Sequence, residues 1–458
     1  MMFRRNFIQN TAVISLGFLG LSRCVSAKSS GTELFRYGAL QEDPAGYLDL
    51  LAGFKYQIIS KGGTTMNDGL LLPGMPDGMA AFPSTSGTVI LIKNHELSPK
   101  SFRYGAFGDQ NERLAQLDKA SLYDYGHGEI PSLGGTSTLI YDETTGQVEL
   151  EYLSLAGTNR NCAGGPTPWG SWISCEEDVS KSSRSAEKDH GYNFEVAASE
   201  KIIMSAPVPI RAMGRFNHEA ICIDPTSGIV YQTEDRGDSL IYRYLPHRLG
   251  DLHQGGRLQI LCIREAKSLD TRNWNEKTFE LAESKEVYWI DIDDVESPED
   301  DLRYRGYDQG AARFARGEGM WYGQGELFFA CTSGGPDELG QVFKYIPSPH
   351  EGTDRESDDP AQLILFAESD DKHILKNCDN LTVAPWGDII LCEDHKDAYL
   401  RGITPEGQIY TLGHNVGHKS EFAGATFSPS GQTLFVNIQG PGHTLAITGP
   451  WANRQPLT

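Results

Sequence analysis

The chain has 458 residues, a formal net charge of −22 and 10% aromatic residues. Such an acidic protein lacks the basic face that supplies most nucleic-acid affinity, and an anionic membrane surface would repel it. Its 50 glycines and 23 prolines suit a chain with frequent tight turns better than a helical one. We therefore expect an all-β protein without a nucleic-acid partner. Part of its acidic excess is a solvated surface, and part is available as metal ligand.

The first 27 residues have the organisation of an export signal. A basic start contains the pair Arg4-Arg5 in the context of a twin-arginine signal. An apolar stretch, Thr11–Ser22, follows, and small residues ending at Ala27 provide a cleavage site. The sequence therefore predicts recognition by the twin-arginine export machinery, which carries proteins that are already folded.

Removal of that signal would leave residues 28–458 as a single domain in the periplasm or outside the cell. Cys24 is a poor candidate for lipidation, because Arg23 stands where a small residue is expected. No other apolar run reaches the length of a membrane-spanning helix. We expect an exported monomer without a membrane span.

The cysteines of the predicted mature chain fall into two classes. Seven remain after Cys24, so at least one is not in an intramolecular disulfide, and none has the Cys-x-x-Cys spacing of a zinc ribbon. Five lie in apolar, strand-like runs, where we expect small buried hydrophobic side chains: Cys175, Cys222, Cys262, Cys331 and Cys392. Cys162 differs, because its surroundings are rich in glycine and polar residues. We interpret Cys162 as a metal ligand.

A hairpin pattern recurs six times along the chain. A polar or small residue, the head, starts an apolar strand, a turn with Gly follows, and a second apolar strand ends in a polar tail. The third copy shows it most clearly, from the head His218-Glu219 through the turn 225–228 to the tail Glu234-Asp235. Repeated sheet units of this kind predict a propeller, here a six-bladed β-propeller with inter-strand insertions such as 181–206 and 270–308. The copies span residues 77–96, 161–177, 218–235, 316–331, 379–394 and 422–437.

The heads and tails of such hairpins share one face of the disc, because the first strand begins where the second ends. The heads would crowd around the axis with the tails beside them. The acidic or thiol residues among them are Cys162, Glu219, Glu318 and Asp379 as heads, and Glu96, Glu176, Glu177, Glu234 and Glu393 as tails.

So many carboxylates cannot converge without cations, because like charges at close range raise each other's pKa or repel. Carboxylate oxygens suit hard cations such as Ca2+ and Mg2+, whereas a thiolate suits a transition metal. Two histidines near these positions, His95 and His218, are either ligands or supports for the ligands.

These segments resemble the PhoX family of alkaline phosphatases, over about residues 70 to 440. The string Cys-Ala-Gly-Gly…Pro-Trp-Gly…Cys-Glu-Glu is specific, whereas Arg-x-Glu-Gly alone would be weak. The resemblance is carried by residues 94–96, 161–177, 214–219, 233–235, 316–319 and 379–381.

The resemblance implies a six-bladed propeller that hydrolyses phosphate monoesters at two iron ions (Fe3+) and calcium ions (Ca2+), bridged by an oxo group. It implies that Cys162 is the thiolate ligand of iron and that Glu219, with a carboxylate from Glu176-Glu177, holds iron or calcium. Glu318 would be a calcium ligand, and Arg316 would clamp the phosphoryl oxygens as the catalytic arginine. The further candidate metal ligands are Glu96, Glu234 and Asp379.

Two other functions fit parts of the pattern. A calcium-dependent lactonase or esterase can also be a six-bladed propeller with an axial Ca2+, but it needs neither thiolate nor iron. A non-enzymatic propeller could use the axial carboxylates for structural calcium. Visible colour separates the first alternative, because an iron–thiolate protein absorbs visible light. Failure to hydrolyse a chromogenic phosphate ester with both metals present would favour the second.

Overall fold

The computed structural model describes residues 38–451; the predicted signal, residues 1–27, lies outside them. Within the described residues the chain forms strands β1 to β26 and a single α-helix, α1 (Leu302–Gln309). Short 3-10 helices occupy Phe102–Tyr104, Leu114–Gln116, Lys119–Ser121, Gly126–Gly128, Arg211–Met213, Leu252–Gln254 and Glu356–Asp358. The expected all-β class is confirmed. None of the helices in this part of the chain is both long and apolar enough to cross a membrane.

Four of the sheets are separate antiparallel units. The first contains β4 (Pro76–Pro83), β5 (Val89–His95), β6 (Gly134–Asp142) and β7 (Gln147–Thr158). The second contains β8 (Asn161–Pro166), β9 (Ser171–Glu176) and β10 (Asn193–Ala197). The third runs from β20 (Cys378–Val383) through β21 (Ile389–Glu393), β22 (Tyr399–Ile403) and β23 (Ile409–Asn415) to β2 (Leu48–Leu51) and β1 (Leu40–Gln41). The fourth contains β24 (Phe422–Phe427), β25 (Thr433–Ile438), β26 (His443–Thr448) and β3 (Lys55–Lys61).

A nine-stranded sheet completes the arrangement. Its first half is β11 (His218–Ile223), β12 (Val230–Glu234), β13 (Ile241–Pro246), β14 (Gly256–Ile263) and β15 (Ser284–Asp291). Its second half is β19 (Gln362–Glu368), β18 (Gln341–Ile346), β17 (Glu326–Cys331) and β16 (Gly317–Gly323). The halves are joined because Ser284 to Glu286 of β15 pair with β19. The insertion expected at 270–308 supplies this joining strand as well as α1.

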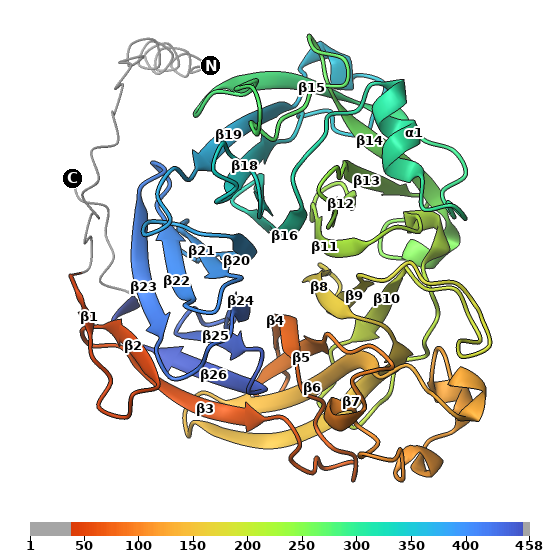
Figure 1. Ribbon diagram of the computed structural model, residues 1–458, viewed down its shortest axis with the longest axis vertical. Helices are drawn as coiled ribbons and strands as arrows, with labels where there is room; N and C mark the ends of the chain where they lie inside the picture. The colour runs from red at the N-terminus through yellow and green to blue at the C-terminus, as the bar shows by residue number, and fades with distance from the viewer. Residues whose placement is uncertain (1–37, 452–458) are drawn as a thin grey trace, which may run out of the picture. The chain divides into compact units, whose positions relative to one another are not determined.

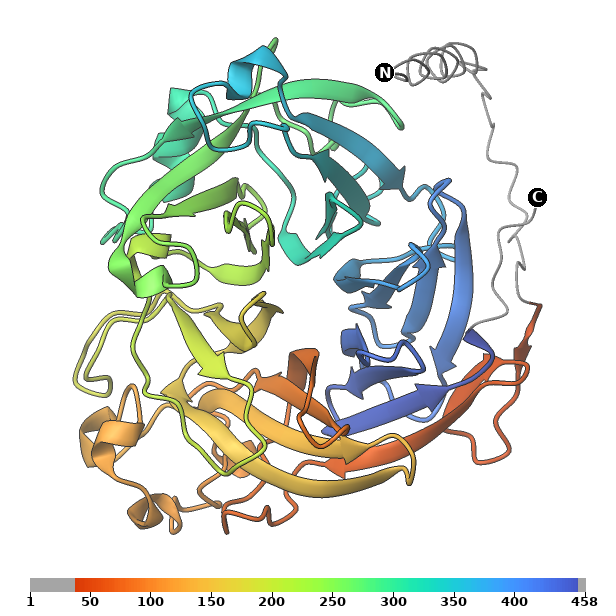
Figure 2. The same cartoon turned by 180° about the vertical axis from the view of Figure 1, so that it is seen from behind.

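The sheets stand around a central axis like the blades of a propeller (Figures 1 and 2). The innermost strands β4, β8, β11, β16, β20 and β24 contact one another in that order, and β24 contacts β4. The ring is closed between distant parts of the sequence, because β3 pairs with β26 along Lys55 to Lys61. The chain is therefore a propeller-like assembly in which each innermost strand begins a hairpin.

The expected Pro-x-Gly turns and apolar strands account for this local structure. Gly170, Gly228, Gly387 and Gly431 have positive φ angles between 71° and 96°, which a residue with a side chain rarely adopts. The strands that these turns connect pack their apolar residues into clusters between neighbouring sheets. The five cysteines expected to be small buried hydrophobic residues lie in these clusters, and all seven cysteines of the described residues are free thiols.

Candidate metal centre and active site

Every innermost strand carries a β-bulge at the same place, near its start. In β8, for example, Asn161 pairs with Glu176 and Gly164 with Ser174, so two residues face one on the partner strand. A bulge redirects a side chain out of the regular alternation of the sheet. The first bulge residues are, in strand order, Asp77, Cys162, Glu219, Glu318, Asp379 and Gly424. Five of the six innermost strands thus present a carboxylate or a thiol at an equivalent position.

These five side chains, together with Glu96 and Glu177 at the ends of two second strands, form three overlapping groups, each with ligand atoms within 4.8 Å of one another. The first group is Asp77, Glu96 and Cys162, the second is Cys162, Glu177 and Glu219, and the third is Glu219, Glu318 and Asp379. We call these seven residues the axial cluster. It contains six of the residues expected from the sequence to hold metal, and it adds Asp77.

The tails supply two residues of the axial cluster and two acidic residues beside it. Glu96, Glu177, Asp235 and Asp394 each follow directly after the last residue of the hairpin's second strand. Asp235 and Asp394 are close enough to influence the bulge carboxylates, because burial and then Asp235 raise the pKa of Glu318, and burial and then Asp394 raise that of Asp379. Glu421 adds to these acidic residues, since burial and then its contact with Asp394 raise its pKa to about 11.

The axial cluster carries more negative charge than its surroundings neutralise. Burial, and then the neighbouring carboxylates, raise the pKa values of Asp77, Glu219 and Glu318 well above their ordinary range. The same two causes raise the pKa of Cys162, whose Sγ lies 2.9 Å from Glu177 Oε2. Buried carboxylates in this state either keep protons or bind cations.

The donor set fits bound metal. Carboxylate oxygens from several strands are ligands for hard cations, and one thiol among them is a ligand for a transition metal. The seven side chains converge from different hairpin strands. Arg160 pairs with Glu96 and Glu177, and Arg316 pairs with Glu318, so no one arginine neutralises the whole cluster. Each of the three overlapping groups could therefore hold a metal ion.

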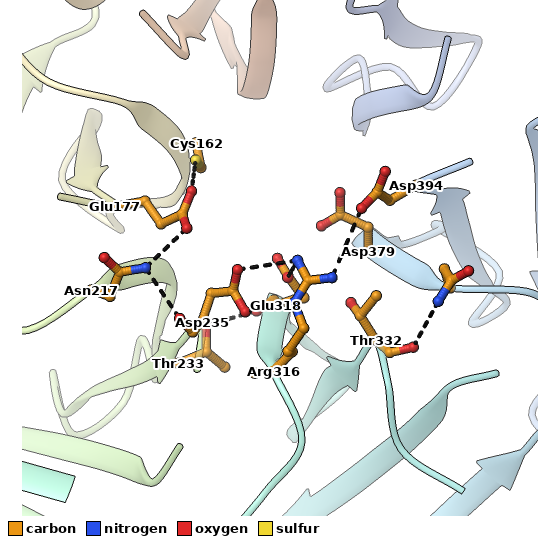
Figure 3. Close-up of polar contacts among 12 residues, drawn as sticks. Cys162, Glu177, Asn217, Thr233, Asp235, Arg316, Glu318, Thr332, Asp379 and Asp394 are labelled. Carbon is orange, nitrogen blue, oxygen red and sulfur yellow. Dashed lines mark hydrogen bonds and ion pairs between the residues drawn. The ribbon is translucent and has the colours of Figure 1, made fainter. Parts of the chain in front are cut away.

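Arg316 lies at the edge of the axial cluster, where Figure 3 shows its guanidinium beside Glu318, with Asp235 on one side and Asp394 on the other. Its Nε donates to Asp235 Oδ1 at 2.8 Å, and its Nη2 donates to Glu318 Oε1 at 2.8 Å. Its Nη1 lies 3.9 Å from Asp394 Oδ2. The residue expected to clamp a phosphoryl group is thus held beside the cluster by carboxylates of three different hairpins.

Two of the expected ligands, Glu176 and Glu234, are not part of the axial cluster. Each is the last residue of its strand and is paired in the sheet, so its side chain lies on the side opposite to that of the next residue. Glu176 accepts hydrogen bonds from the Asn159 amide at 2.8 Å and pairs with His190 Nδ1 at 2.6 Å. Glu234 accepts from the Tyr242 hydroxyl at 3.0 Å. Of the two expected neighbours Glu176 and Glu177, only Glu177 belongs to one of the three groups, and beside Glu234 it is Asp235 that contacts Arg316.

The two histidines also lie outside the three groups. His95 contacts Gly74 O at 2.9 Å and the Ser137 hydroxyl at 2.8 Å, and burial lowers its pKa to about 3. His218 contacts Gly214 O at 3.1 Å and packs against the Phe216 ring. Both are neutral groups that support the strand ends.

The acidic residues that the sequence did not single out were Asp77, Asp235, Asp394 and Glu421. Asp77 is the head of the first copy, whose match to the repeat is looser. Asp235 and Asp394 are the second residues of two tails, and counting sheet alternation from the turn would have found them. Glu421 carried no signal, because it lies outside the hairpin pattern.

Comparisons with known proteins agree with this geometry. Among curated proteins, none matches the chain. The structure of Pseudomonas fluorescens PhoX in complex with vanadate, a transition state analogue, superposes with a TM-score of 0.65 at 17% sequence identity. That superposition covers 90% of this chain and 97% of the Pseudomonas protein, and it supports the propeller-like fold.

A gluconolactonase from Xanthomonas campestris gives a TM-score of only 0.38 at 14% identity, with 92% of this chain and 100% of the other covered. Similarity this weak carries no argument for a lactonase. The family described as alkaline phosphatase PhoX matches residues 35–442, most of the sequence. The protein is accordingly a phosphoric monoester hydrolase, and the chain belongs to the alkaline phosphatase PhoX family.

Proposed function

We propose that this protein is an exported phosphatase that releases inorganic phosphate from phosphate monoesters at an axial cluster of iron (Fe3+) and calcium (Ca2+) ions. The observation that carries the proposal is the convergence of one acidic or thiol side chain from each of five innermost strands, with too few protein cations to balance them. Negative charge at such density is tolerable around metal ions.

The proposed fold is a single six-bladed propeller comprising residues 28–458. The nine-stranded sheet would count as two blades, with innermost strands β11 and β16, connected at their outer edges by β15 and β19. The recurrence of the bulge in every innermost strand supports this count, since each blade would then present one equivalent position at the axis.

The Cys162 thiol would distinguish the iron site from the calcium site. Cys162, with Glu177 and Glu219, would hold iron, because a thiolate prefers a transition metal to calcium. The all-carboxylate group of Glu219, Glu318 and Asp379 would hold calcium, and Asp77 and Glu96 complete the cluster beside Cys162. The bound cations would supply Lewis-acid stabilisation of the negative charge on a phosphoryl group.

The protein itself would position the ester. Arg316 uses its Nε and Nη2 on Asp235 and Glu318, which fixes the plane of the guanidinium. A guanidinium held in this way keeps Nη1 to donate to a phosphoryl oxygen, and phosphoryl transfer depends mainly on positioning and charge stabilisation. Arg316 would therefore bind the phosphoryl oxygens.

The proposal is tested by metal analysis and hydrolysis of p-nitrophenyl phosphate with protein purified without added metal. We expect both iron and calcium, visible absorbance and phosphate release. Calcium alone, without phosphate release, would favour a lactonase or a binding scaffold. Arg316→Gln should lose turnover by at least about a hundredfold while it keeps its metal. Near-normal turnover in Arg316→Gln would remove Arg316 from the mechanism.

We further propose that the enzyme is a monomer that reaches the periplasm or the exterior through the twin-arginine machinery. The signal pattern within residues 1–27 supports this route. Replacing both Arg4 and Arg5 by Lys should retain the enzyme in the cytoplasm. Export of that variant at the wild-type rate would contradict the proposed route.

A further inference from the structure

A second arginine, Arg160, occupies the same place in its hairpin as Arg316. Each lies two residues before a bulge residue of the axial cluster, Cys162 for Arg160 and Glu318 for Arg316. Both have left-handed backbone angles, with φ of 44° for Arg160 and 52° for Arg316. Met75 and Asn377, which also lie two residues before a bulge residue, share this conformation with φ of 47° and 50°, so it belongs to the repeat.

The backbone contacts of the two arginines are also equivalent. The Arg160 amide donates to Leu97 O and the Arg316 amide donates to Arg236 O, both at 2.9 Å. In each case the acceptor belongs to the residue that follows an acidic tail residue of the preceding hairpin. The Arg160 carbonyl accepts from the Glu177 amide at 2.9 Å, and the Arg316 carbonyl accepts from the Thr332 amide at 3.0 Å. The repeat thus places both arginines at the same level above the cluster.

The Arg160 side chain is held in the same manner as that of Arg316. Its Nε and Nη2 donate to Glu96 Oε1 at 3.1 Å and 3.0 Å, and its Nη2 also pairs with Glu177. Each guanidinium therefore uses its Nε and Nη2 donors on two acidic residues of the pocket. One of these comes from the arginine's own hairpin, and the other from the preceding hairpin.

The third nitrogen, Nη1, differs between the two guanidinium groups: that of Arg316 lies 3.9 Å from Asp394 Oδ2, whereas no residue among 38–451 pairs with that of Arg160. Neither Arg160 Nη1 nor Arg316 Nη1 donates a hydrogen bond to any residue among 38–451. The Arg160 side chain is 40% exposed and that of Arg316 is 35% exposed. Each arginine combines a fixed orientation with a partly exposed Nη1 group that can donate to an anion.

A hydrogen-bonded arc connects the two arginines. Asn217 Nδ2 donates to Glu177 Oε1 at 2.9 Å and to Asp235 O at 3.1 Å, as Figure 3 shows. Glu177 pairs with Arg160, and Asp235 pairs with Arg316. The two guanidinium groups are therefore the ends of one connected set of side chains along the rim of the axial cluster.

We propose that Arg160 is a second anion-binding residue, which contacts the phosphoryl group of the substrate opposite Arg316. This inference rests on the proposed phosphatase function and extends it to a site with two arginines. A substrate anion approaching a protein of net charge −22 needs local positive charge. If cations balance the carboxylates of the axial cluster, the two arginine charges become available for that purpose.

The experiment measures binding of inorganic phosphate to the metal-loaded enzyme by calorimetry, with metal content determined on the same samples. We expect Arg160→Gln to raise the Kd for phosphate by about tenfold to a hundredfold, the usual size of a charge-assisted hydrogen bond, with metal content unchanged. Arg160→Lys should fall between Arg160→Gln and the wild type, because it keeps the charge and loses the planar fork. Arg305→Gln is the matched control, since Arg305 pairs with Asp301 on α1, away from the cluster.

A double-mutant cycle tests whether the two arginines bind the same anion. The losses in Arg160→Gln and Arg316→Gln should be non-additive if both contact one phosphate. A Kd for phosphate equal to that of the wild type in Arg160→Gln would overturn the inference. Loss of metal in proportion to loss of binding would also overturn it, because Arg160 would then only hold Glu96 and Glu177 in place.

The outcome is separable from that of the proposed function. If the wild type neither binds phosphate nor hydrolyses esters, the phosphatase proposal fails together with this one. If the wild type and Arg316→Gln behave as expected while Arg160→Gln matches the wild type, only the role of Arg160 is wrong.

Discussion

Buried carboxylates that are adjacent in the sequence have opposite surroundings in this protein. Glu177 belongs to the axial cluster, whereas Glu176 is enclosed by protein donors, including His190 and the amides of Asn159 and Gly191. Glu393 likewise pairs with Arg401 at 2.9 Å, one residue before Asp394, an acidic residue beside the axial cluster. The protein supplies partners on one side of each strand end, whereas acidic side chains crowd together on the other. We call Glu176, Glu234 and Glu393 the protein-paired carboxylates.

The comparison teaches that burial of an acidic residue does not by itself indicate a metal site. The protein-paired carboxylates have protein partners and stabilise the strand ends. The axial carboxylates raise each other's pKa values and are balanced incompletely by Arg160 and Arg316. Substitutions on the two sides should therefore affect different properties of the protein.

The largest effect is expected in the axial cluster, on activity. Glu219→Gln should reduce phosphate ester hydrolysis by more than about a hundredfold, because replacing even supporting residues of a metal site costs 10–100-fold. The free energy of unfolding of the metal-free protein should be unchanged or higher, since one charge is removed from a crowded acidic site. Hydrolysis, bound metal and chemical denaturation of the metal-free form measure these quantities. Clear destabilisation of metal-free Glu219→Gln would show that Glu219 has a structural role as well.

Substitution of a protein-paired carboxylate should instead reduce stability and leave metal content unchanged. Glu393→Ala removes the carboxylate that lies 2.9 Å from Nε of the buried Arg401, and the free energy of unfolding should fall by roughly 3–5 kcal/mol. Metal content per folded molecule should stay the same. Denaturant unfolding with elemental analysis distinguishes this outcome from direct ligation, for which metal loss would be the main effect.

The buried pair of His190 and Glu176 predicts a pH dependence. Burial alone lowers the pKa of His190, but Glu176, Asp124 and Asp178 more than offset it and raise the pKa to about 10. Because the folded pKa lies above the ordinary 6.5, the stabilisation is complete below pH 6.5 and is lost as pH rises through 10. The contribution should decline by at most about 1.4 kcal/mol per pH unit in this window.

Denaturant unfolding of the wild type and of His190→Gln between pH 6 and pH 9 measures this contribution. The difference in free energy of unfolding between the two proteins should shrink as pH rises. A constant difference would mean that His190 is already neutral in the folded protein at pH 6.

The smallest effect is expected for Glu234→Gln. A Gln side chain can still accept from the Tyr242 hydroxyl, so hydrolysis should stay within about twofold of the wild type and stability within about 1 kcal/mol. Asp235→Asn, one residue further, is the matched variant. It weakens the partner of Arg316 and should impair hydrolysis more strongly. Equal effects of the two substitutions would argue against a functional difference between the two sides of the strand end.

The sequence by itself determined the hairpin repeat, the propeller-like class and the gathering of heads and tails on one face. The pattern of turn glycines and apolar strands fixes local geometry, and hairpin ends must lie together. It also distinguished Cys162 from the cysteines of apolar strands. Six residues predicted to hold metal lie in the axial cluster for this reason.

Only the tertiary structure decided which side chain of each acidic pair faces the axis. Sheet register sets this choice, and a shift of one residue exchanges the two sides of a strand. The bulges at Asp77 and Cys162 insert such a shift at the start of the innermost strands, and no local sequence pattern marked them. The pairing of β15 with β19 and the equivalence of Arg160 with Arg316 likewise depend on contacts between segments distant in the sequence.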